Sequence, residues 1–291
     1  MIKFIHISDL HFSFYTWNPL QIFSKRIIGN FNLLFNRKKT IGLHLLDEFL
    51  HEIDQIKPTH ILISGDFTST SLAQEYEKSI LFIQELKKRG IEVFALPGNH
   101  DAYTKKAYRK KTFYQQLKDC LPFRGEFNFN LEEHRVAAFK LSGDLYLVLV
   151  DAACYTSLFR SNGNFSFEIQ GHLESLLENI PKDAKIWLCS HFPFFEHEHP
   201  KRVLEGAKNL KSIIEKFHQI EIYFHGHTHR QALVDLRENH LPIISDSGSL
   251  TLKHRSSYNV IDLKDSSLQL SRVQHQTTFQ TVEVINTTRH L

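Results

Sequence analysis

The sequence of 291 residues predicts an α/β fold. Short runs rich in β-branched and aromatic residues alternate along the chain with longer segments whose apolar residues recur at helical spacing. Several of the short runs end directly at Asp, Asn or His, and open α/β sheets bind their ligands beyond the carboxyl ends of their strands. Together these observations predict a set of strands that carries a polar site at one edge.

The first part of the chain contains the clearest strands and helices. Strands are expected at residues 2–8, 60–64 and 91–97. The helix expected at 40–56 has apolar residues at helical spacing and stops before Pro58, and the helix expected at 71–89 is closed by Gly90 as a C-cap. A basic helix at 104–118 follows the third strand.

The second part of the chain is richer in strands. Buried strands are expected at residues 136–141, 145–151, 186–190 and 222–225. Beyond residue 230 the pattern changes to short runs with polar turns between them, at 231–236, 242–245, 258–263, 268–273 and 281–285. These runs predict an antiparallel set, at about 230–291, that closes the fold. Since the chain has no internal repeat and no long linker, we expect a single domain over 1–291.

Composition indicates a soluble protein of a reducing compartment. Apolar residues make up 42% of the chain and charged residues 23%, which is ordinary for a globular protein. The net charge of +3 does not by itself indicate nucleic-acid binding. Cys120, Cys154 and Cys189 are scattered without CxxC spacing, so no disulfide framework is expected. The N-terminus does not resemble a signal peptide, and no apolar run approaches the about 18 residues that span a bilayer, so we expect a cytoplasmic location.

A histidine cluster at residues 225–229 suggests a metal site. His225, His227 and His229 occupy alternate positions, and imidazole is the commonest protein ligand for transition metals. On its own, such a cluster could equally form a solvated turn. Other expected strands, however, end at ligand-type residues, namely Asp9 and His11, Asp66, Asn99 with His100 and Asp101, and His191. Agreement among five strand ends favours a shared metal site over five unrelated turns.

These motifs resemble a known family. In order along the chain they read DLH (9–11), GD (65–66), GNHD (98–101), SH (190–191) and GHTH (226–229). They are similar to the signature of the calcineurin-like metallophosphoesterases, over residues 1 to about 250. ISDLHFS, SGDFTS and LPGNHD further resemble the cyclic-nucleotide-phosphodiesterase-like branch. The resemblance implies a four-layer α/β/β/α sandwich and a metal-dependent phosphoric ester hydrolase.

The resemblance also implies roles for individual residues. Matching by motif gives one ion to Asp9, His11 and His229, and the other ion to Asn99, His191 and His227. Asp66 would bridge the two ions. His100 resembles the histidine that assists the leaving group, with Asp101 orienting it, and His225 would support the site or pack beneath it.

The implied cofactor is a pair of divalent transition-metal ions. The mixture of carboxylate, imidazole and amide ligands suits Mn, Fe, Zn or Ni and does not choose among them. Such a pair clamps a phosphoryl group and acidifies a bridging water, which would attack the phosphate ester in line. Many relatives have a second aspartate three residues after the GD aspartate, where this chain has Ser69.

The segment 17–39 bears on the substrate. Its apolar residues Leu20, Phe23, Ile27, Phe31 and Leu34 form one helical stripe among basic residues. Such a helix either packs on the domain or makes a peripheral contact with a membrane or a lipid-like substrate. The basic run 105–111 either places cations near the phosphate site or forms a solvated helix face. EHEHP at 196–200 is expected to form a rim loop of the site.

Four candidate functions are compared. The leading one is a phosphodiesterase or phosphatase that acts on a small phosphate ester. The alternative is a pyrophosphatase that acts on a nucleotide-linked lipid such as UDP-2,3-diacylglucosamine, which HGHTHR and the apolar segment suggest. A nuclease is disfavoured because the net charge is small and no nucleic-acid module is visible. A non-enzymatic scaffold would require missing ligands, and none is missing.

Overall fold

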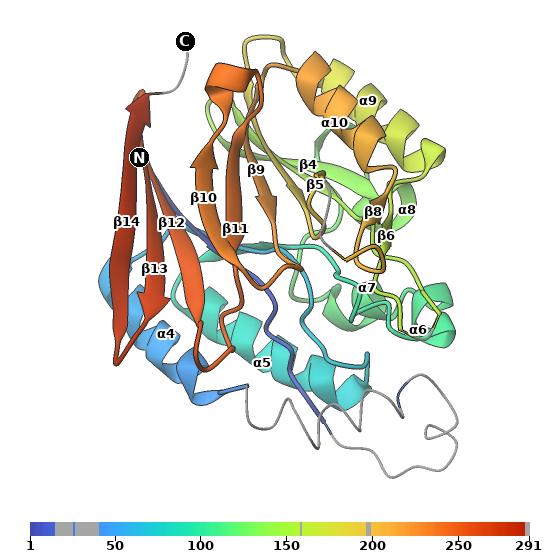
Figure 1. Cartoon of the computed structure of the whole chain (residues 1–291), viewed down its shortest axis with the longest axis vertical. Helices are drawn as coiled ribbons and strands as arrows, with labels where there is room; N and C mark the ends of the chain where they lie inside the picture. The colour runs from blue at the N-terminus through green and yellow to red at the C-terminus, as the bar shows by residue number, and fades with distance from the viewer. Residues whose placement is uncertain (15–25, 27–40, 158, 196–198, 289–291) are drawn as a thin grey trace.

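The computed structural model describes residues 1–14, 26, 41–157, 159–195 and 199–288. Two six-stranded sheets face each other, and helices cover the outer face of each sheet (Figure 1). The predicted α/β fold class is therefore confirmed, with the layers arranged as helices, sheet, sheet and helices. No helix in the described ranges has the length and apolar character needed to cross a bilayer.

The first sheet has the order β14-β13-β12-β1-β2-β3. Its strands are β1 (Ile2–Ile7), β2 (His60–Ile63), β3 (Glu92–Ala95), β12 (Ser257–Lys264), β13 (Ser267–His275) and β14 (Phe279–Thr288). β1, β2 and β3 run parallel, and β12 to β14 form an antiparallel meander beside β1. Helices α4 (His44–Ile56) and α5 (Ala73–Lys88) cover the outer face, where Phe49 packs against Tyr258.

The second sheet has the order β10-β11-β9-β7-β5-β4. Its strands are β4 (Val136–Ser142), β5 (Leu145–Val150), β7 (Lys185–Ser190), β9 (Ile220–His225), β10 (Gln231–Asp235) and β11 (Ile243–Ser247). The four inner strands are parallel, and the two edge strands run antiparallel to their neighbours. Helices α9 (Phe167–Asn179) and α10 (Ala207–Lys216) cover the outer face.

The remaining described elements are short. They are α6 (Lys105–Arg109), α7 (Thr112–Leu117), η2 (Glu126–Asn128), α8 (Leu131–His134), η3 (Arg237–Asn239) and the small pair β6 (Gly163–Asn164) and β8 (Leu204–Glu205). β6 and β8 pair in parallel as a two-stranded sheet.

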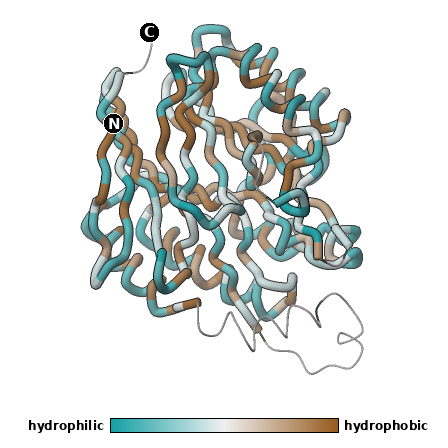
Figure 2. The backbone as a smooth tube through the Cα atoms, in the orientation of Figure 1, coloured by the Kyte–Doolittle hydropathy of each residue, from teal (hydrophilic) through white to brown (hydrophobic). Residues whose placement is uncertain are grey.

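Aromatic side chains fill the space between the sheets. The ring of Phe4 on β1 lies 5.1 Å from Trp187 on β7 and 5.5 Å from Phe224 on β9, measured between ring centroids. All three side chains are fully buried, and Figure 2 shows the hydrophobic segments concentrated along the strands. Because large aromatic rings contribute much of the buried apolar area in a core, this contact holds the two sheets face to face.

Some elements differ from the sequence-based expectations. The basic helix expected at 104–118 is two short helices, because Lys111 adopts a left-handed conformation with φ 49°. The helix expected from residue 40 begins at His44, and Ile41 instead forms a bridge with Leu252. Helices α9 and α10 were not anticipated. The C-terminal strands divide between the two sheets, and β11 pairs in parallel with β9.

The amphipathic segment 17–39 lies outside the described residues apart from Arg26. The guanidinium of Arg26 donates hydrogen bonds to the carbonyls of Thr70 and Ser71, at 3.0 Å and 2.9 Å. Residues 196–198 of the expected rim loop also lie outside the described part. The lysines and arginine of the basic run 105–111 are exposed.

Candidate metal centre

The carboxyl ends of the parallel strands of both sheets meet at one edge. Asp9 follows β1 and its N–H donates to the carbonyl of Gly65 after β2, at 3.1 Å. In the second sheet, the N–H of Gly226 after β9 donates to the carbonyl of His191 after β7, at 3.0 Å. Ser249 joins the sheets, because its hydroxyl donates to the carbonyl of Asp9 at 2.8 Å. The predicted site residues are thereby held together at this edge.

Three of them form a first cluster. The Nε2 atom of His229 lies 3.0 Å from Oδ1 of Asp9 and 3.1 Å from Nε2 of His11. His11 Nε2 lies 3.6 Å from the same Asp9 oxygen. Asp9 and His11 are buried, whereas His229 is partly exposed. One carboxylate and two imidazoles therefore converge on a single point that opens toward solvent at His229.

Asp66 lies between this cluster and a second one. Its Oδ2 atom is 3.9 Å from Nε2 of His11 and 3.5 Å from Nε2 of His191. Potential ligand atoms of Asp9, Asp66 and His191 all lie within 4.8 Å of one another, as do those of His11, Asp66 and His100. The carboxylate of Asp66 is therefore placed to reach two neighbouring positions.

Asn99 and His227 lie beside the second cluster. Nδ1 of His227 is 2.8 Å from Oδ1 of Asn99, and the rings of His227 and His191 are 5.2 Å apart between centroids. His227 Nε2 contacts the carbonyl of Arg202 at 3.0 Å. His227 therefore presents its Nδ1 atom to the site, beside Asn99, while its Nε2 atom faces away toward Arg202.

The spacing of these atoms fits metal ligation. Around an ion with octahedral bonds of about 2.1 Å, neighbouring ligand atoms lie about 3 Å apart. The pairs His229–Asp9, His229–His11 and His227–Asn99 are 3.0, 3.1 and 2.8 Å apart. In addition, the buried Nε2 of His191 makes no hydrogen bond within the described part of the chain. Its Nδ1 faces the carbonyl of Ser64 at 2.8 Å, which fixes the tautomer that presents an Nε2 lone pair to a metal.

His100 lies over the same space. Its ring packs edge-on against His11, with 4.8 Å between ring centroids, and stacks on Tyr103. Its Nδ1 atom is 2.7 Å from the carbonyl of Ser69. Since a carbonyl can only accept, Nδ1 carries the hydrogen, and Nε2 is the ring nitrogen that can exchange a proton with a substrate.

Asp101 lies between the loops after β2 and β3. Its carboxylate accepts hydrogen bonds from the backbone N–H groups of Phe67, Thr68 and Gly98. Burial, together with repulsion from Asp66, raises the pKa of Asp101 to about 7 despite these hydrogen bonds. The Ser69 carbonyl orients the His100 ring, and Asp101 holds the loops after β2 and β3 against each other.

The backbone is unusual at the predicted ligands. Positive φ angles occur at Asp9 (55°), His11 (47°), Asp66 (55°), His227 (67°) and His229 (53°). Residues other than glycine adopt this conformation at a cost of about 1–3 kcal/mol, and such residues cluster at functional sites. The concentration of this strain on five predicted ligands supports a functional centre at this edge.

Two glycines of the motifs lie so close to a carboxylate that no side chain fits at their positions. A Cβ atom at Gly98 would lie 2.2 Å from Oδ1 of Asp66, and one at Gly226 would lie 2.6 Å from Oδ2 of Asp9. Either contact is far below a van der Waals distance, so a side chain would displace the carboxylate. Glycine in GNHD therefore leaves space for the carboxylate of Asp66, and glycine in GHTH leaves space for that of Asp9.

The electrostatics of the cluster favour cation binding. Burial would raise the pKa of Asp9, but the imidazoles of His229, His191 and His11 hold the pKa of this carboxyl well below its usual range. Burial would lower the pKa of His191, yet the adjacent Asp66 carboxylate raises it to about 9, so this imidazole must release a proton before its Nε2 can ligate a metal ion. Asp9 is therefore ionised at neutral pH, the form that binds a metal ion.

The sequence analysis missed Asp246, which lies behind the histidine motif. Asp246, at the end of β11, accepts a hydrogen bond from the hydroxyl of Thr228 and one from the N–H of Gly248 at 2.9 Å. His225 is buried, lies 3.7 Å from the Asp246 carboxylate, and burial lowers its pKa to about 4. Asp246 and His225 therefore support the turn that carries His227 and His229. The strand-end aspartate in PIISD was the available signal.

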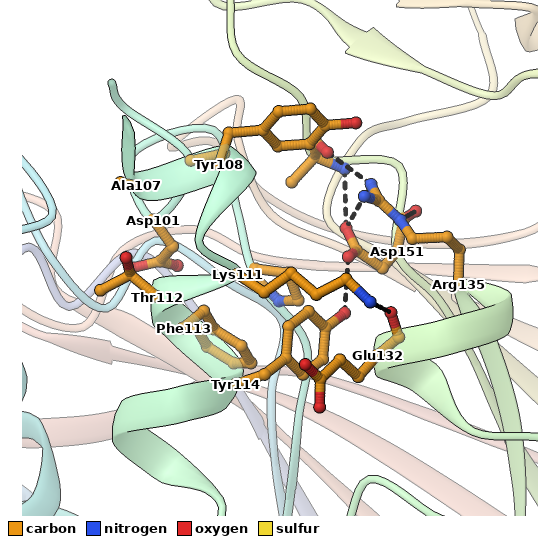
Figure 3. A pocket seen from close by; sticks show the side chains of 13 residues that line it. Asp101, Ala107, Tyr108, Lys111, Thr112, Phe113, Tyr114, Glu132, Arg135 and Asp151 are labelled. Atoms are coloured by element: carbon orange, nitrogen blue, oxygen red, sulfur yellow. Dashed lines mark hydrogen bonds and ion pairs between the residues drawn. The ribbon is translucent and has the colours of Figure 1, made fainter. Parts of the chain in front are cut away.

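Another strand end carries an aspartate that is not part of the metal cluster. Asp151 follows β5 and is buried, and its carboxylate lies 3.1 Å from the guanidinium of Arg135 and 2.6 Å from the hydroxyl of Tyr114. Figure 3 shows this triad on one wall of a small pocket, with Asp101 on another wall. The triad ties α7 and the loop before β4 to the second sheet.

This triad should contribute to stability and not to metal binding. Replacing Asp151 by Asn is expected to lower the free energy of unfolding by about 3 kcal/mol, because Arg135 then keeps a largely buried charge without its partner. Tyr114→Phe removes one hydrogen bond and should cost about 1–2 kcal/mol. Urea denaturation of both variants measures these losses. A variant that keeps wild-type stability but loses bound metal would contradict the assignment.

Comparisons with known proteins agree on the fold. A family model described as calcineurin-like phosphoesterase matches residues 2–231. No curated protein matches the chain. Among solved structures, a dimetal phosphatase from Danio rerio superposes with a TM-score of 0.65 at 13% identity, covering 97% of this chain and 98% of that one.

Two further structures show the same fold. Purple acid phosphatase PPD1 from yellow lupin (Lupinus luteus) seeds superposes with a TM-score of 0.64 at 11% identity, covering 99% of this chain and 54% of that one. TT1561 of Thermus thermophilus has a TM-score of 0.51 at 12% identity, covering 88% of this chain and 93% of that one. At these identities the likeness concerns the arrangement of the chain alone.

Proposed function

The chain belongs to the calcineurin-like phosphoesterase family and is a phosphoric ester hydrolase, and from this premise we propose that its strand-end cluster is a dinuclear metal site that hydrolyses phosphodiesters. The observation that supports the proposal most strongly is the position of Asp66, 3.9 Å from His11 and 3.5 Å from His191. A carboxylate between two groups of nitrogen ligands is what a bridged pair of ions requires.

The proposed ligands divide into two sets. One ion would be held by Asp9, His11 and His229, and the other by Asn99, His191 and His227, with Asp66 shared. The first set rests on the convergence of its three ligand atoms, and the second on the approach of His227 to Asn99 and of His191 to Asp66. The donors are carboxylate, imidazole and amide, which suits Mn, Fe or Zn.

When bound, the two ions would polarise the phosphoryl oxygens and provide a nucleophile near neutral pH. The chain itself supplies the orientation and the proton. The carbonyls of Ser64 and Ser69 fix the rings of His191 and His100. We assign His100 as the residue that delivers a proton to the leaving oxygen, since its Nδ1 is held by Ser69 and its ring lies against His11. Asp101 positions the loops after β2 and β3, which carry Asp66 and His100.

A phosphodiester is proposed as the substrate because the motifs are similar to those of the cyclic-nucleotide-phosphodiesterase-like branch. The alternative, a pyrophosphatase for UDP-2,3-diacylglucosamine, depends on the apolar segment 17–39, most of which lies outside the described residues. Both hypotheses share the same metal chemistry, so substrate preference is what separates them.

A metal-reconstituted activity panel tests the proposal. Protein stripped with a chelator and reloaded with Mn²⁺ is expected to hydrolyse an aryl phosphodiester at least about tenfold faster, in kcat/KM, than the matching aryl phosphomonoester. Cyclic nucleotides and UDP-2,3-diacylglucosamine complete the panel. Full activity in the stripped protein would contradict the metal requirement, and a preference for the monoester would contradict the diesterase assignment.

A further inference from the structure

A cationic groove begins at the metal centre. It has a volume of about 360 Å³, and one of its lining side chains is His229 of the first cluster. The others include Arg230, His254, Arg255 and His275, together with two glutamines, and none of the lining residues is acidic. Arg230, His254 and Arg255 are exposed. The groove therefore connects a proposed metal ligand directly to a surface of positive charge and hydrogen-bond donors.

The walls of this groove are fixed to the centre. Gln231 donates from its amide to the carbonyls of Tyr258 and Val273, at 2.8 Å and 3.1 Å, which pins the start of β10 onto the first sheet. The segment that leads to His254 and Arg255 is held by Thr251, whose hydroxyl donates to the carbonyl of Leu10 at 3.0 Å. The opening is thus formed by the packing of the two sheets.

The wall of the groove that is formed by His275 is also anchored. The N–H of His275 donates to the carbonyl of Ser256 at 2.8 Å, and its Nε2 lies 2.9 Å from the carboxylate of Glu48. By contrast, the side chains of His254 and Arg255 make no hydrogen bond or ion pair with the described part of the chain. A guanidinium and an imidazole on a fixed rim next to a phosphoryl-transfer centre are placed to receive an anion.

We propose that the groove binds a second phosphate of the substrate. The preferred substrate is then a small phosphodiester with another phosphoryl group, carried on the side of the scissile phosphate opposite the leaving group. The inference rests on the proposed function, because it takes the scissile phosphate to lie at the metal centre. Guanidinium groups recognise phosphate by paired hydrogen bonds. A groove of this volume accommodates a small group, whereas single-stranded nucleic acid is bound along extended basic tracks with stacking aromatics.

Two substrates that differ by one phosphate test the proposal. They are thymidine 5′-(p-nitrophenyl phosphate) and the same compound with a 3′-phosphate, each assayed with the Mn²⁺-loaded full chain. The wild-type protein is expected to prefer the 3′-phosphorylated compound by about 10- to 100-fold in kcat/KM at low salt, the effect of one or two charge-assisted hydrogen bonds. In the double variant His254→Gln/Arg255→Gln the preference should fall to about threefold or less.

This comparison distinguishes a failure of the groove proposal from a failure of the proposed function. Because the preference compares two substrates on the same protein, a general loss of activity in the variant cancels. The control variant Lys208→Gln/Lys211→Gln alters exposed charges on α10 and should keep the wild-type preference. Failure of the wild type to hydrolyse either compound would instead count against the proposed function.

Two results would overturn the groove assignment. One is hydrolysis of both compounds at equal rates by the wild type. The other is a rate that rises with the length of a single-stranded oligonucleotide and loses this rise in the double variant, which would assign the groove to a nucleic-acid backbone. A preference that weakens as salt increases from 50 to 500 mM, an interval of about tenfold in ionic strength, would support phosphate binding at an exposed cationic rim.

Discussion

Asp66→Ala is expected to lose both metal ions and to lower kcat/KM on an aryl phosphodiester by at least about 10³-fold. That figure is the upper range for removal of a single electrostatic stabiliser, and here one change would remove the ligand that we propose is common to two ions. The geometric basis is the position of the Asp66 carboxylate, 3.9 Å from Nε2 of His11 and 3.5 Å from Nε2 of His191. Elemental analysis after reconstitution and gel filtration measures the metal content.

The matched control is Asp183→Ala, which removes an exposed carboxylate from the turn after α9. It should retain two ions and full activity. Circular dichroism belongs with the measurement, because Asp66 also accepts a hydrogen bond from the backbone N–H of His100 at 2.8 Å. A folded Asp66→Ala protein that retains full occupancy would exclude a bridging role for this residue.

The second large effect is expected at His100, and it should separate binding from chemistry. His100→Asn should retain both ions and lower turnover by about 10²–10⁴-fold on a diester with a poor leaving group, the range for lost acid assistance. Asparagine places an amide N–H near the position of the imidazole Nδ1, so the contact with the carbonyl of Ser69 can persist. The proton donor is lost while the shape of the loop is kept.

The leaving group provides the internal control. With p-nitrophenolate, which departs without protonation, the His100→Asn variant should lose much less activity. His172→Asn serves as the matched variant, since the Nδ1 of His172 also faces a backbone carbonyl, that of His134, away from the site. An equal loss on good and poor leaving groups would remove His100 from the proton transfer.

The sequence was informative where a potential metal ligand, Asp, Asn or His, directly followed a predicted strand. Asp9, Asp66, Asn99 and His191 were expected to converge because parallel strands bring their carboxyl ends to one edge, and the structure brings them together. The division of ligands between two ions came from the resemblance alone. Nothing in the spacing of the motifs indicates which imidazole faces which carboxylate.

The same rule could not distinguish a site residue from a structural one. Asp151 also ends a strand, but its carboxylate pairs with Arg135, sixteen residues earlier in the chain. The hydrogen bonds of Asp101 could not be predicted for a related reason, since its partners are backbone N–H groups of a distant loop, which no sequence pattern identifies. The break in the helix expected at 104–118 falls at a left-handed lysine and not at a glycine or proline, so the usual signal of a helix end was absent.

The most direct test of the dinuclear site is anomalous X-ray diffraction from crystals of the Mn²⁺-loaded protein. We predict two anomalous peaks about 3.5–4 Å apart, one beside Asp9, His11 and His229 and the other beside Asn99, His191 and His227, with the Asp66 carboxylate between them. A single peak under saturating Mn²⁺, or two peaks that do not share Asp66, would contradict the account.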